Sequence, residues 1–164
     1  MPPAPTCSPI GESELIRIRA VADYQFGAGC GEGLFPDCVK VVKSRKTGKV
    51  KGIYLGDELL ATLKPSDGFL AMSTPGAVRL AAALPPPRYR VAVIDDVVKF
   101  IKEGRNLFAK HVLESDPDIR PGEEVMITDA KGQVVAVGRA ALTGEEMKRF
   151  KIGLAVKIRR GEED

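Results

Sequence analysis

Hydrophobic and polar residues in the first eighty positions follow two different periods, which predict a mixture of helices and strands. Within residues 12–23, the apolar residues Leu15, Ile18 and Ala22 recur at the spacing of one helical face. The next segment, 27–33, carries four glycines. It lacks the Lys-Ser/Thr ending of a phosphate-binding loop, and no strand clearly leads it into a helix. We therefore expect it to form a flexible or tight turn.

Two short apolar segments further along predict a β-hairpin. Residues 39–43 and 50–55 are typical of strands, and residues 44–48 between them are typical of a turn in which Gly48 takes a positive φ. The alternation of apolar and polar residues is imperfect, so the register of the two strands stays open. A third strand is predicted over residues 59–64.

A run of three prolines marks the clearest boundary in the chain. Residues 85–87 stiffen the backbone and cannot continue a helix. The helix before them is predicted over residues 73–84, with Thr74 as its cap and Pro75 at its first helical position. The predicted parts are a loose tail (1–11), an α+β domain (12–84), a proline-rich linker (85–88), a second domain (89–161) and an acidic tail (162–164).

The second half opens with a short apolar strand over residues 91–94, followed by an amphipathic helix. Asp95 or Asp96 is predicted to cap this helix, and Gly104 is predicted to end it. Its apolar face is predicted to consist of Val97, Phe100 and Ile101.

The remaining residues predict a small domain that is mostly β. Thr143 and Glu146 have the spacing of a capping box, and Leu142 and Met147 occupy the positions of a hydrophobic staple. Short strands, tight turns and two small helices favour a compact pseudo-barrel, so the fold class predicted for the whole chain is α+β. The strands are predicted at 107–113, 124–128, 134–140 and 154–159, with a turn at 129–132.

Composition narrows the classes of protein that this chain can represent. With 44% hydrophobic and 29% charged residues, the 164 residues can bury a core, so wholesale disorder is not expected. No run approaches the roughly eighteen apolar residues of a membrane helix. Residues 1–7 have neither the basic start nor the apolar core of a secretory signal. We therefore expect a cytoplasmic protein that has no membrane partner.

The three cysteines, Cys7, Cys30 and Cys38, are widely and unequally spaced. Structural zinc sites usually contain CxxC pairs, and none is present, so we expect no metal and no cofactor. A disulfide between Cys30 and Cys38 is sterically conceivable, but a reducing compartment is the default for such a chain. The role of the cysteines stays open.

The sequence offers little for catalysis. His111 is the only imidazole, and no Gly-x-Ser-x-Gly elbow or Cys–His pairing is present. The carboxylate pairs Asp95–Asp96 and Glu145–Glu146 stand at helix starts, where the helix dipole already accounts for them. We therefore expect no catalytic residues and no enzyme activity.

Basic residues are more informative, although the net charge is only +3. The predicted hairpin carries six cations in twelve residues without an acid among them: Lys40, Lys43, Arg45, Lys46, Lys49 and Lys51. Such a local positive field attracts phosphates by releasing their counterions. The alternative is a solvated sheet edge on which lysine blocks strand-to-strand aggregation.

Two further basic groups lie in the second half. Lys148, Arg149 and Lys151 close the capped helix, and Lys157, Arg159 and Arg160 lie on or just after the last strand. Lysines at a helix end also complement its dipole, which is the structural alternative. The other group surrounds Gly104, a residue beside which a nucleic-acid backbone has room to approach. Its members are Lys102, Arg105, Asn106 and Lys110.

Several blocks in the second half resemble PUA domains, the RNA-binding module named for pseudouridine synthases and archaeosine transglycosylases. These are residues 104–112, 119–125, 136–140 and 153–157. The first half resembles the domain that precedes the PUA domain in archaeal tRNA-guanine transglycosylases and their archaeosine synthase relatives. Its blocks are residues 23–27, 34–35, 44–49, 67–69 and 76–77. The catalytic barrel of those enzymes needs roughly 250 residues and does not fit here.

The resemblance implies a non-catalytic protein that binds structured RNA, with tRNA near its acceptor end as the expected partner. A-form RNA is recognised by shape, phosphates and 2′-hydroxyls, for which arginine, lysine and asparagine are suitable donors. The expected RNA-binding residues are Lys102, Gly104, Arg105, Asn106, Phe108, Lys110, His111, Arg139, Lys148, Arg149, Lys157, Arg159 and Arg160. The expected auxiliary contacts are Lys43, Arg45, Lys46 and Lys49.

Two other functions remain open. In the first, the chain is an accessory subunit that docks on a separate transglycosylase-type catalytic protein and delivers tRNA to it. An apolar patch on the first domain would favour that function. In the second it is a small enzyme that uses His111 or a cysteine. The sequence does not specify which tRNA is bound, whether a catalytic partner exists, or the oligomeric state.

Overall fold

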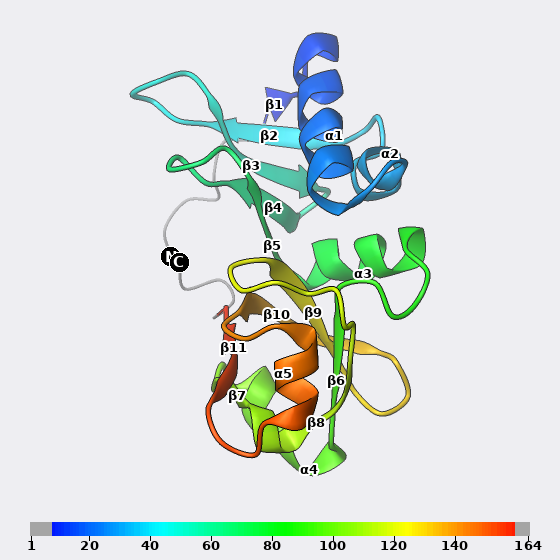
Figure 1. Cartoon of the computed structure of the whole chain (residues 1–164). Coiled ribbons are helices and arrows are strands. Elements are labelled where there is room, and N and C mark those ends of the chain that lie inside the picture. Colours follow the sequence, from blue (N-terminus) through cyan, green and yellow to red (C-terminus); the bar gives the residue numbers. More distant parts are fainter. Residues whose placement is uncertain (1–7, 160–164) are drawn as a thin grey trace. The chain divides into compact units, whose positions relative to one another are not determined.

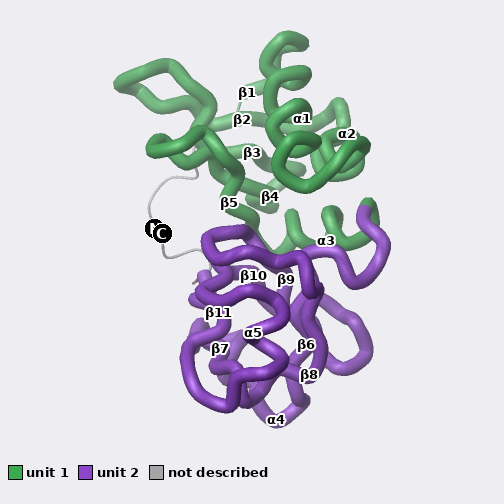
Figure 2. The backbone as a smooth tube through the Cα atoms, viewed as in Figure 1, with its two compact units in different colours: residues 1–83 green, residues 84–164 purple. Residues whose placement is uncertain are grey.

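The computed structural model describes residues 8–159, and residues 1–7 and 160–164 lie outside the part that it describes. The chain divides into two compact units, residues 1–83 (unit 1) and residues 84–164 (unit 2), as Figure 2 shows. Helices and strands are combined in both units, and the strands of unit 2 form a nearly closed sheet. The predicted α+β fold class is confirmed.

Unit 1 contains an antiparallel sheet whose strand order follows the sequence, together with three helices within the described residues (Figure 1). The strands are β1 (Ser8–Pro9), β2 (Lys40–Lys43), β3 (Val50–Leu55), β4 (Glu58–Leu63) and β5 (Leu70–Met72). The helices are α1 (Glu12–Phe26), α2 (Cys30–Leu34) and α3 (Thr74–Ala83).

The predicted first helix and the predicted hairpin are both confirmed. Helix α1 buries Ile18, Ala22 and Phe26 at intervals of four residues, so its core-facing row extends one turn beyond the prediction. Strands β2 and β3 pair antiparallel, and Gly48 in the turn between them has φ of 70°. Strand β5 was not predicted, because its three residues are all buried and therefore show no alternation.

The predicted loose tail is wrong at its end. Ser8 and Pro9 form β1, which pairs antiparallel with Val41 and Lys40 of β2. A proline fits this position because an edge strand tolerates a missing backbone donor. The rest of the chain before residue 8, and the predicted acidic tail, lie outside the described residues.

The glycine-rich segment is also corrected, because part of it forms the helix α2 rather than a loop. A side chain at Gly31 would place its Cβ 2.4 Å from the carbonyl oxygen of Arg19, so only glycine allows α2 to lie this close to α1. The amide of Gly31 donates to the Asp23 carboxylate over 2.7 Å. The glycines therefore serve close packing between two helices.

Helix α3 begins at Thr74 as an element, but its cap is Ser73 and not Thr74. The Ser73 hydroxyl accepts from the amide of Gly76 at 3.2 Å, which is the position of an N-cap side chain. The same hydroxyl lies within hydrogen-bonding distance of the carbonyls of Leu59 and Leu60. Ser73 therefore fixes the start of α3 to β4.

Unit 2 contains a six-stranded sheet in the order β7-β11-β10-β9-β6-β8. Strands β6 and β9 are parallel, and the other pairs are antiparallel. The strands are β6 (Arg90–Val93), β7 (Leu107–Phe108), β8 (Val112–Ser115), β9 (Glu124–Thr128), β10 (Val134–Ala140) and β11 (Leu154–Ile158). The helices are α4 (Asp95–Lys102), the 3₁₀-helix η1 (Ala109–His111) and α5 (Gly144–Arg149).

The strand predicted over residues 107–113 is wrong, because η1 divides it into β7 and β8. These two strands occupy opposite ends of the strand order, and the three residues of η1 carry the chain from one end to the other. Such a short connection requires the sheet to curl back on itself. The pseudo-barrel is therefore nearly closed, as predicted.

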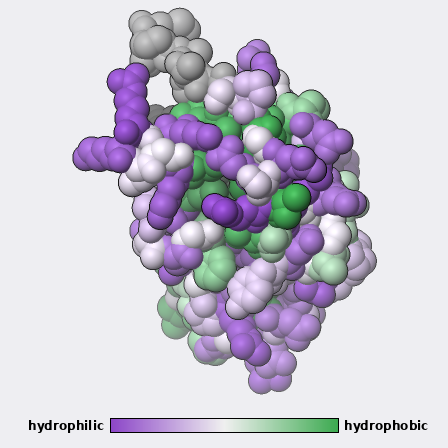
Figure 3. All heavy atoms as spheres, turned by 90° about the horizontal axis from the view of Figure 1, so that it is seen from above, coloured by the Kyte–Doolittle hydropathy of each residue, from purple (hydrophilic) through white to green (hydrophobic). Residues whose placement is uncertain are grey.

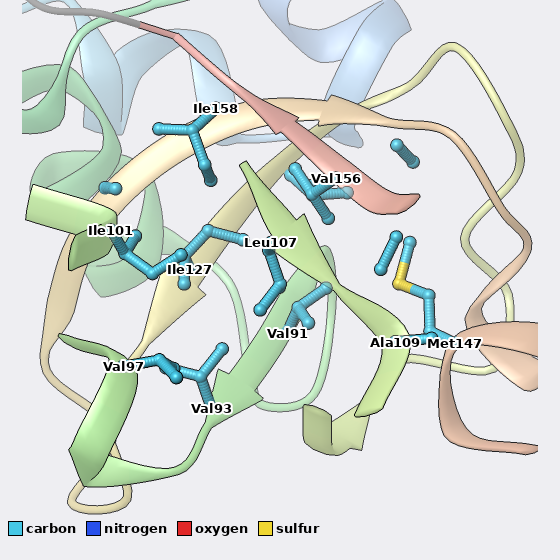
Figure 4. Close-up of a cluster of buried hydrophobic side chains, with 14 of the residues drawn as sticks. Val91, Val93, Val97, Ile101, Leu107, Ala109, Ile127, Met147, Val156 and Ile158 are labelled. Atoms are coloured by element: carbon cyan, nitrogen blue, oxygen red, sulfur yellow. The ribbon is translucent and has the colours of Figure 1, made fainter. Parts of the chain in front are cut away.

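The core of unit 2 lies inside this curled sheet (Figure 4). Val91 and Val93 from β6, Ile127 from β9 and Val156 from β11 point into it. Met147 of α5 is fully buried in the same cluster, and Leu142 packs against it, so the predicted staple residues share one core. The capping box is also confirmed, because Thr143 and Glu146 exchange both side-chain hydrogen bonds with each other's backbone amides.

Helix α4 differs from its prediction at its start and on one face. Ile94 occupies the N-cap position without a side-chain bond, so neither Asp95 nor Asp96 is the cap. Both aspartates lie in the first turn, where their charges complement the helix dipole. Val97 and Ile101 are buried as predicted, but Phe100 is 41% exposed and does not belong to the core-facing side.

Candidate nucleic-acid interface

The turn after α4 is built around Gly104, which ends the helix as predicted. Gly104 has φ of 93°, a conformation that side chains disfavour. Its amide donates to the Ile101 carbonyl at 2.9 Å, and the amide of Arg105 donates to the Phe100 carbonyl at 3.1 Å. Together these bonds form a Schellman motif. The backbone therefore turns sharply and directs residues 105 and 106 away from the helix.

Arg105 gains its position from Phe100. Its guanidinium carbon lies 5.1 Å from the centre of the Phe100 ring, within the range of a cation–π contact. This contact accounts for the exposure of Phe100, which was predicted to be buried. The arginine is exposed as well, so the ring supports a cation that faces solvent. Lys102, one turn earlier, is also exposed.

Asn106 connects this turn to the last strand. Its side-chain oxygen accepts from the amide of Ile158 at 3.0 Å, which places Asn106 beside β11. Strand β7, which follows Asn106 directly, pairs antiparallel with β11. Asn106 therefore has a structural part in the sheet besides any contact with a ligand. Lys157 directly precedes Ile158 on β11.

Two cations project from the outer face of the sheet at one register position. Arg139 of β10 lies opposite Lys157 of β11, and both are exposed. The two strands come close at Gly138, where a Cβ would lie 2.5 Å from the Lys157 carbonyl oxygen. We call the exposed residues Arg105, Asn106, Arg139 and Lys157 the basic strip, because they lie on or beside three neighbouring strands.

Arg159, predicted to bind RNA, is instead engaged by the protein itself. Its guanidinium forms an ion pair through both terminal nitrogens with the carboxylate of Glu124, whose side chain is only 3% exposed. A buried carboxylate needs such a partner. We therefore remove Arg159 from the set of RNA-binding candidates. Arg160 lies outside the described residues.

A second basic group lies at η1 and α5. These two helices pack together, and Figure 4 shows Ala109 and Met147 side by side at their junction. Lys110 and Lys148 each follow one of those buried residues, and both are exposed. Lys148 forms a 2.8 Å ion pair with Glu114, in which both side chains are largely solvated.

Three other predicted residues accompany this second group. Arg149 is exposed, and Phe108 is 47% exposed at the end of β7. His111 is half-buried in η1 rather than in a strand, and its carbonyl accepts from the amide of Ile94 at 3.1 Å. The structure therefore separates the predicted residues of unit 2 into the basic strip and a group at η1 and α5.

Unit 1 carries the auxiliary cations at the end of its first hairpin. Arg45, Lys46 and Lys49 are exposed in the β2–β3 turn, where the amide of Gly48 donates to the Ser44 carbonyl at 2.8 Å. Lys43 differs from them, because it forms a 3.1 Å ion pair with Glu14 of α1. The tip of the hairpin, rather than its base, therefore carries the cations that form no ion pair among the described residues.

Sequence reasoning missed the role of Glu124. It is the single acid in β9, a strand whose five residues are all buried. A carboxylate in such a strand predicts a positively charged partner elsewhere in the chain, because a buried charge is costly unless it is paired. Pattern reasoning also left Lys151 out of the candidate set, although it is exposed between the exposed side chains of Phe150 and Ile152.

Residues 8–159 contain no group of three or more His, Cys, Asp or Glu side chains that could hold a metal ion. Burial, and secondarily the carboxylate of Glu123, raise the pKa of the Tyr89 phenol above its ordinary value. Cys38 is exposed and free, so the conceivable disulfide with Cys30 is absent. No helix in the described part is long and apolar enough to span a membrane.

Two family models match the chain one after the other. Residues 16–87 match the patch-forming domain C2 of tRNA-guanine transglycosylase, and residues 89–161 match the PUA domain. The chain is a PUA-domain protein. The resemblance drawn from the blocks in the sequence is therefore confirmed for both halves.

Curated relatives of this PUA-domain protein include archaeal tRNA-guanine(15) transglycosylases. The one from Methanothermobacter thermautotrophicus is 46% identical over 148 residues, which are 90% of this chain and 23% of that protein. The one from Thermococcus kodakarensis is 46% identical over 146 residues, which are 89% of this chain and 25% of that protein. The chain thus spans about a quarter of the length of these relatives.

Solved structures share the fold of the PUA-domain protein over nearly its whole length. A hypothetical protein from Pyrococcus horikoshii aligns with a TM-score of 0.74 and 20% identity, covering 97% of this chain and 96% of that one. A conserved PUA domain protein from Thermoplasma acidophilum aligns with a TM-score of 0.73 and 24% identity, covering 97% and 95%. At these identities the likeness establishes the fold alone.

Proposed function

We propose that this PUA-domain protein binds structured RNA through the basic strip of unit 2 and has no catalytic activity of its own. The observation that carries the proposal is the register of the sheet, which sets Arg139 opposite Lys157 on a PUA domain. Both cations are exposed, and Arg105 and Asn106 lie just before β7, the strand that pairs with β11. Four donors spaced along a curved sheet suit a run of phosphates and 2′-hydroxyls.

The proposed ligand is tRNA, contacted at its acceptor-stem region. The support is that the curated relatives are named tRNA-guanine(15) transglycosylases and that this chain matches their C2 and PUA portions. The cations at η1 and α5 would extend the contact along the same RNA, and the hairpin tip of unit 1 would add an auxiliary contact. Residues 16–87 and 89–161 match the C2 and PUA domains, which supports a non-catalytic role for these residues.

Salt dependence of binding tests the basic strip. Lys157→Ala and Arg139→Ala should each weaken binding of folded tRNA and lower the slope of log affinity against log salt by about one, since each removes one phosphate contact. Fluorescence anisotropy over a salt series measures both quantities. Lys131→Ala, an exposed cation in the β9–β10 turn, is the matched control and should change neither. Unchanged slopes in both strip variants would remove the strip from the interface.

The accessory-subunit function remains the second candidate. It is favoured by large apolar residues exposed on unit 1, namely Ile16, Tyr24 and Phe69. It predicts that the chain co-purifies with a transglycosylase-type catalytic protein after nuclease treatment. Loss of the association on nuclease treatment would assign it to shared RNA and reject direct docking.

A further inference from the structure

Helix α1 carries two apolar rows on opposite faces. Ile18, Ala22 and Phe26 form the buried row, and the core of unit 1 accounts for them. A second row, offset from the first by two positions, has the same spacing of four and consists of Ile16, Ala20 and Tyr24. Ile16 is 62% exposed, Tyr24 is 82% exposed, and Ala20 is exposed as well. A helix that is apolar on both faces is typical of one that is covered on both.

The exposed row is held rigidly at its C-terminal end. The Tyr24 and Phe69 rings stack nearly parallel, with centroids 6.0 Å apart and an interplanar angle of 8°. Gln25 fixes this arrangement, because its side-chain amide donates to and accepts from the backbone of Leu70, each at 2.9 Å. The side chains that would meet a partner are therefore pre-positioned, which lowers the entropy cost of docking.

The charges near the row argue against an RNA ligand at this face. Glu14 is paired with Lys43, Arg19 with Asp37, and Lys64 with Asp67. These pairs cancel one another's field, in contrast to the hairpin tip. Figure 3 shows hydrophobic residues among hydrophilic ones on one face of the molecule. A neutral, apolar and rigid surface suits a protein partner better than a phosphate backbone.

The exposed row is also complementary to itself. If two copies of α1 cross antiparallel about Ala20, the small alanine lies at the crossing, and Ile16 of each copy meets Tyr24 of the other. The same two-fold operation sets Arg17 opposite Asp23, which are both exposed and oppositely charged. Rows spaced by four residues interdigitate at a crossing of about −50°. We propose that this face is an isologous interface between two copies of the chain.

The size of the row sets the strength of this dimer. From the exposed fractions of Ile16, Tyr24 and Phe69, the row and the ring stacked on it expose roughly 400 Å² of residue surface per copy, most of it apolar. Two copies then bury roughly 800 Å² of it, so even with its polar rim the interface lies at the low end of specific ones. The dimer is therefore weak and reversible, forming at micromolar or higher protein concentration.

Sedimentation equilibrium of the full chain, from low micromolar to near-millimolar protein, tests the interface. The wild-type chain should shift from monomer to dimer across this range, and Ala20→Arg should stay monomeric, because a charged side chain cannot enter the crossing. Arginine is a good helix former, so the exposed substitution leaves α1 intact. Ala130→Arg makes the same change in an exposed turn of unit 2 and should dimerise like the wild type. Arg17→Glu should weaken the dimer, because it brings acids together at both ends.

A cross-link tests the two-fold axis itself. In a background with Cys7→Ser and Cys38→Ser, oxidised Ala20→Cys should form a covalent dimer readily, and Ala130→Cys should not. A wild-type chain that is monomeric throughout, or a dimer that survives Ala20→Arg, would overturn the proposal. Tyr24→Ala weakening tRNA binding by a monomer would also overturn it, because the face would then belong to RNA. The tRNA affinity of the Ala20→Arg variant tests the proposed function separately. If this variant binds tRNA normally, the proposed function stands whether or not the chain dimerises.

Discussion

Arg159 and Lys157 lie two residues apart, at the end of β11, and have different roles. Strand periodicity directs both side chains to the outer face, so the sequence predicts two equivalent phosphate contacts. The structure separates them, because Glu124 on β9 is buried and takes the guanidinium of Arg159. Lys157 has Arg139 as its cross-strand neighbour and stays exposed. A residue's role thus depends on a partner more than thirty positions away, which local pattern does not reveal.

This difference predicts unequal effects of two substitutions on the free energy of unfolding. Arg159→Ala should lower the free energy of unfolding by about 2–3 kcal/mol, because it leaves a buried carboxylate without its cation. Lys157→Ala should change it by less than about 0.5 kcal/mol, as is usual for exposed side chains. Urea denaturation measures both. The double variant Glu124→Leu with Arg159→Leu should recover part of the loss; equal destabilisation by all three would contradict a specific ion pair.

At the scale of elements, the sequence predicts those with a clear period or a capping signal and misses those defined by packing. Helix α1 and the capping box of α5 carry local signals, and both are found as predicted. Helix α2 and the break at η1 carry none. The first depends on how closely two helices approach, and the second on where a curled sheet must close. The exposed Phe100 is a similar case, since Arg105 rather than the core accounts for its position.

The approach of α2 to α1 predicts a steep cost for a single methyl group. Gly31→Ala should destabilise unit 1 by about 2 kcal/mol, because the new Cβ meets the Arg19 backbone, which cannot move like a side-chain end. Thermal or urea unfolding followed by circular dichroism measures the change. Gly11→Ala is the matched control: its nearest contact is at 3.4 Å and its φ is −74°, so it should cost only the exchange of a glycine N-cap for alanine, about 1 kcal/mol or less. Equal stability of the two variants would show that α1 and α2 separate easily.

At the scale of the whole molecule, the resemblance of sequence blocks indicated both family matches, and the register of the sheet then sorted the predicted site residues. Motif blocks placed Gly104, Asn106 and Arg139 in one candidate site. Only the strand order shows that Arg139 and Lys157 are neighbours and that Lys110 belongs with α5 instead. The hairpin cations belong to the other unit, so their contribution to the affinity for one RNA is tested by substituting them.

The last prediction concerns whether both units hold one RNA molecule. If the hairpin tip and the basic strip contact the same tRNA, joining them in one chain raises affinity through effective concentration. The triple variant Arg45→Ala, Lys46→Ala and Lys49→Ala should then weaken tRNA binding and lower the salt slope by up to about three. Combining it with Lys157→Ala should lower the slope further, each surface contributing its own contacts. A tRNA fragment too short to reach beyond unit 2 should bind wild type and triple variant equally. If full-length tRNA also binds the wild type and the triple variant with equal affinity, the hairpin lysines and arginine instead serve to keep the sheet soluble.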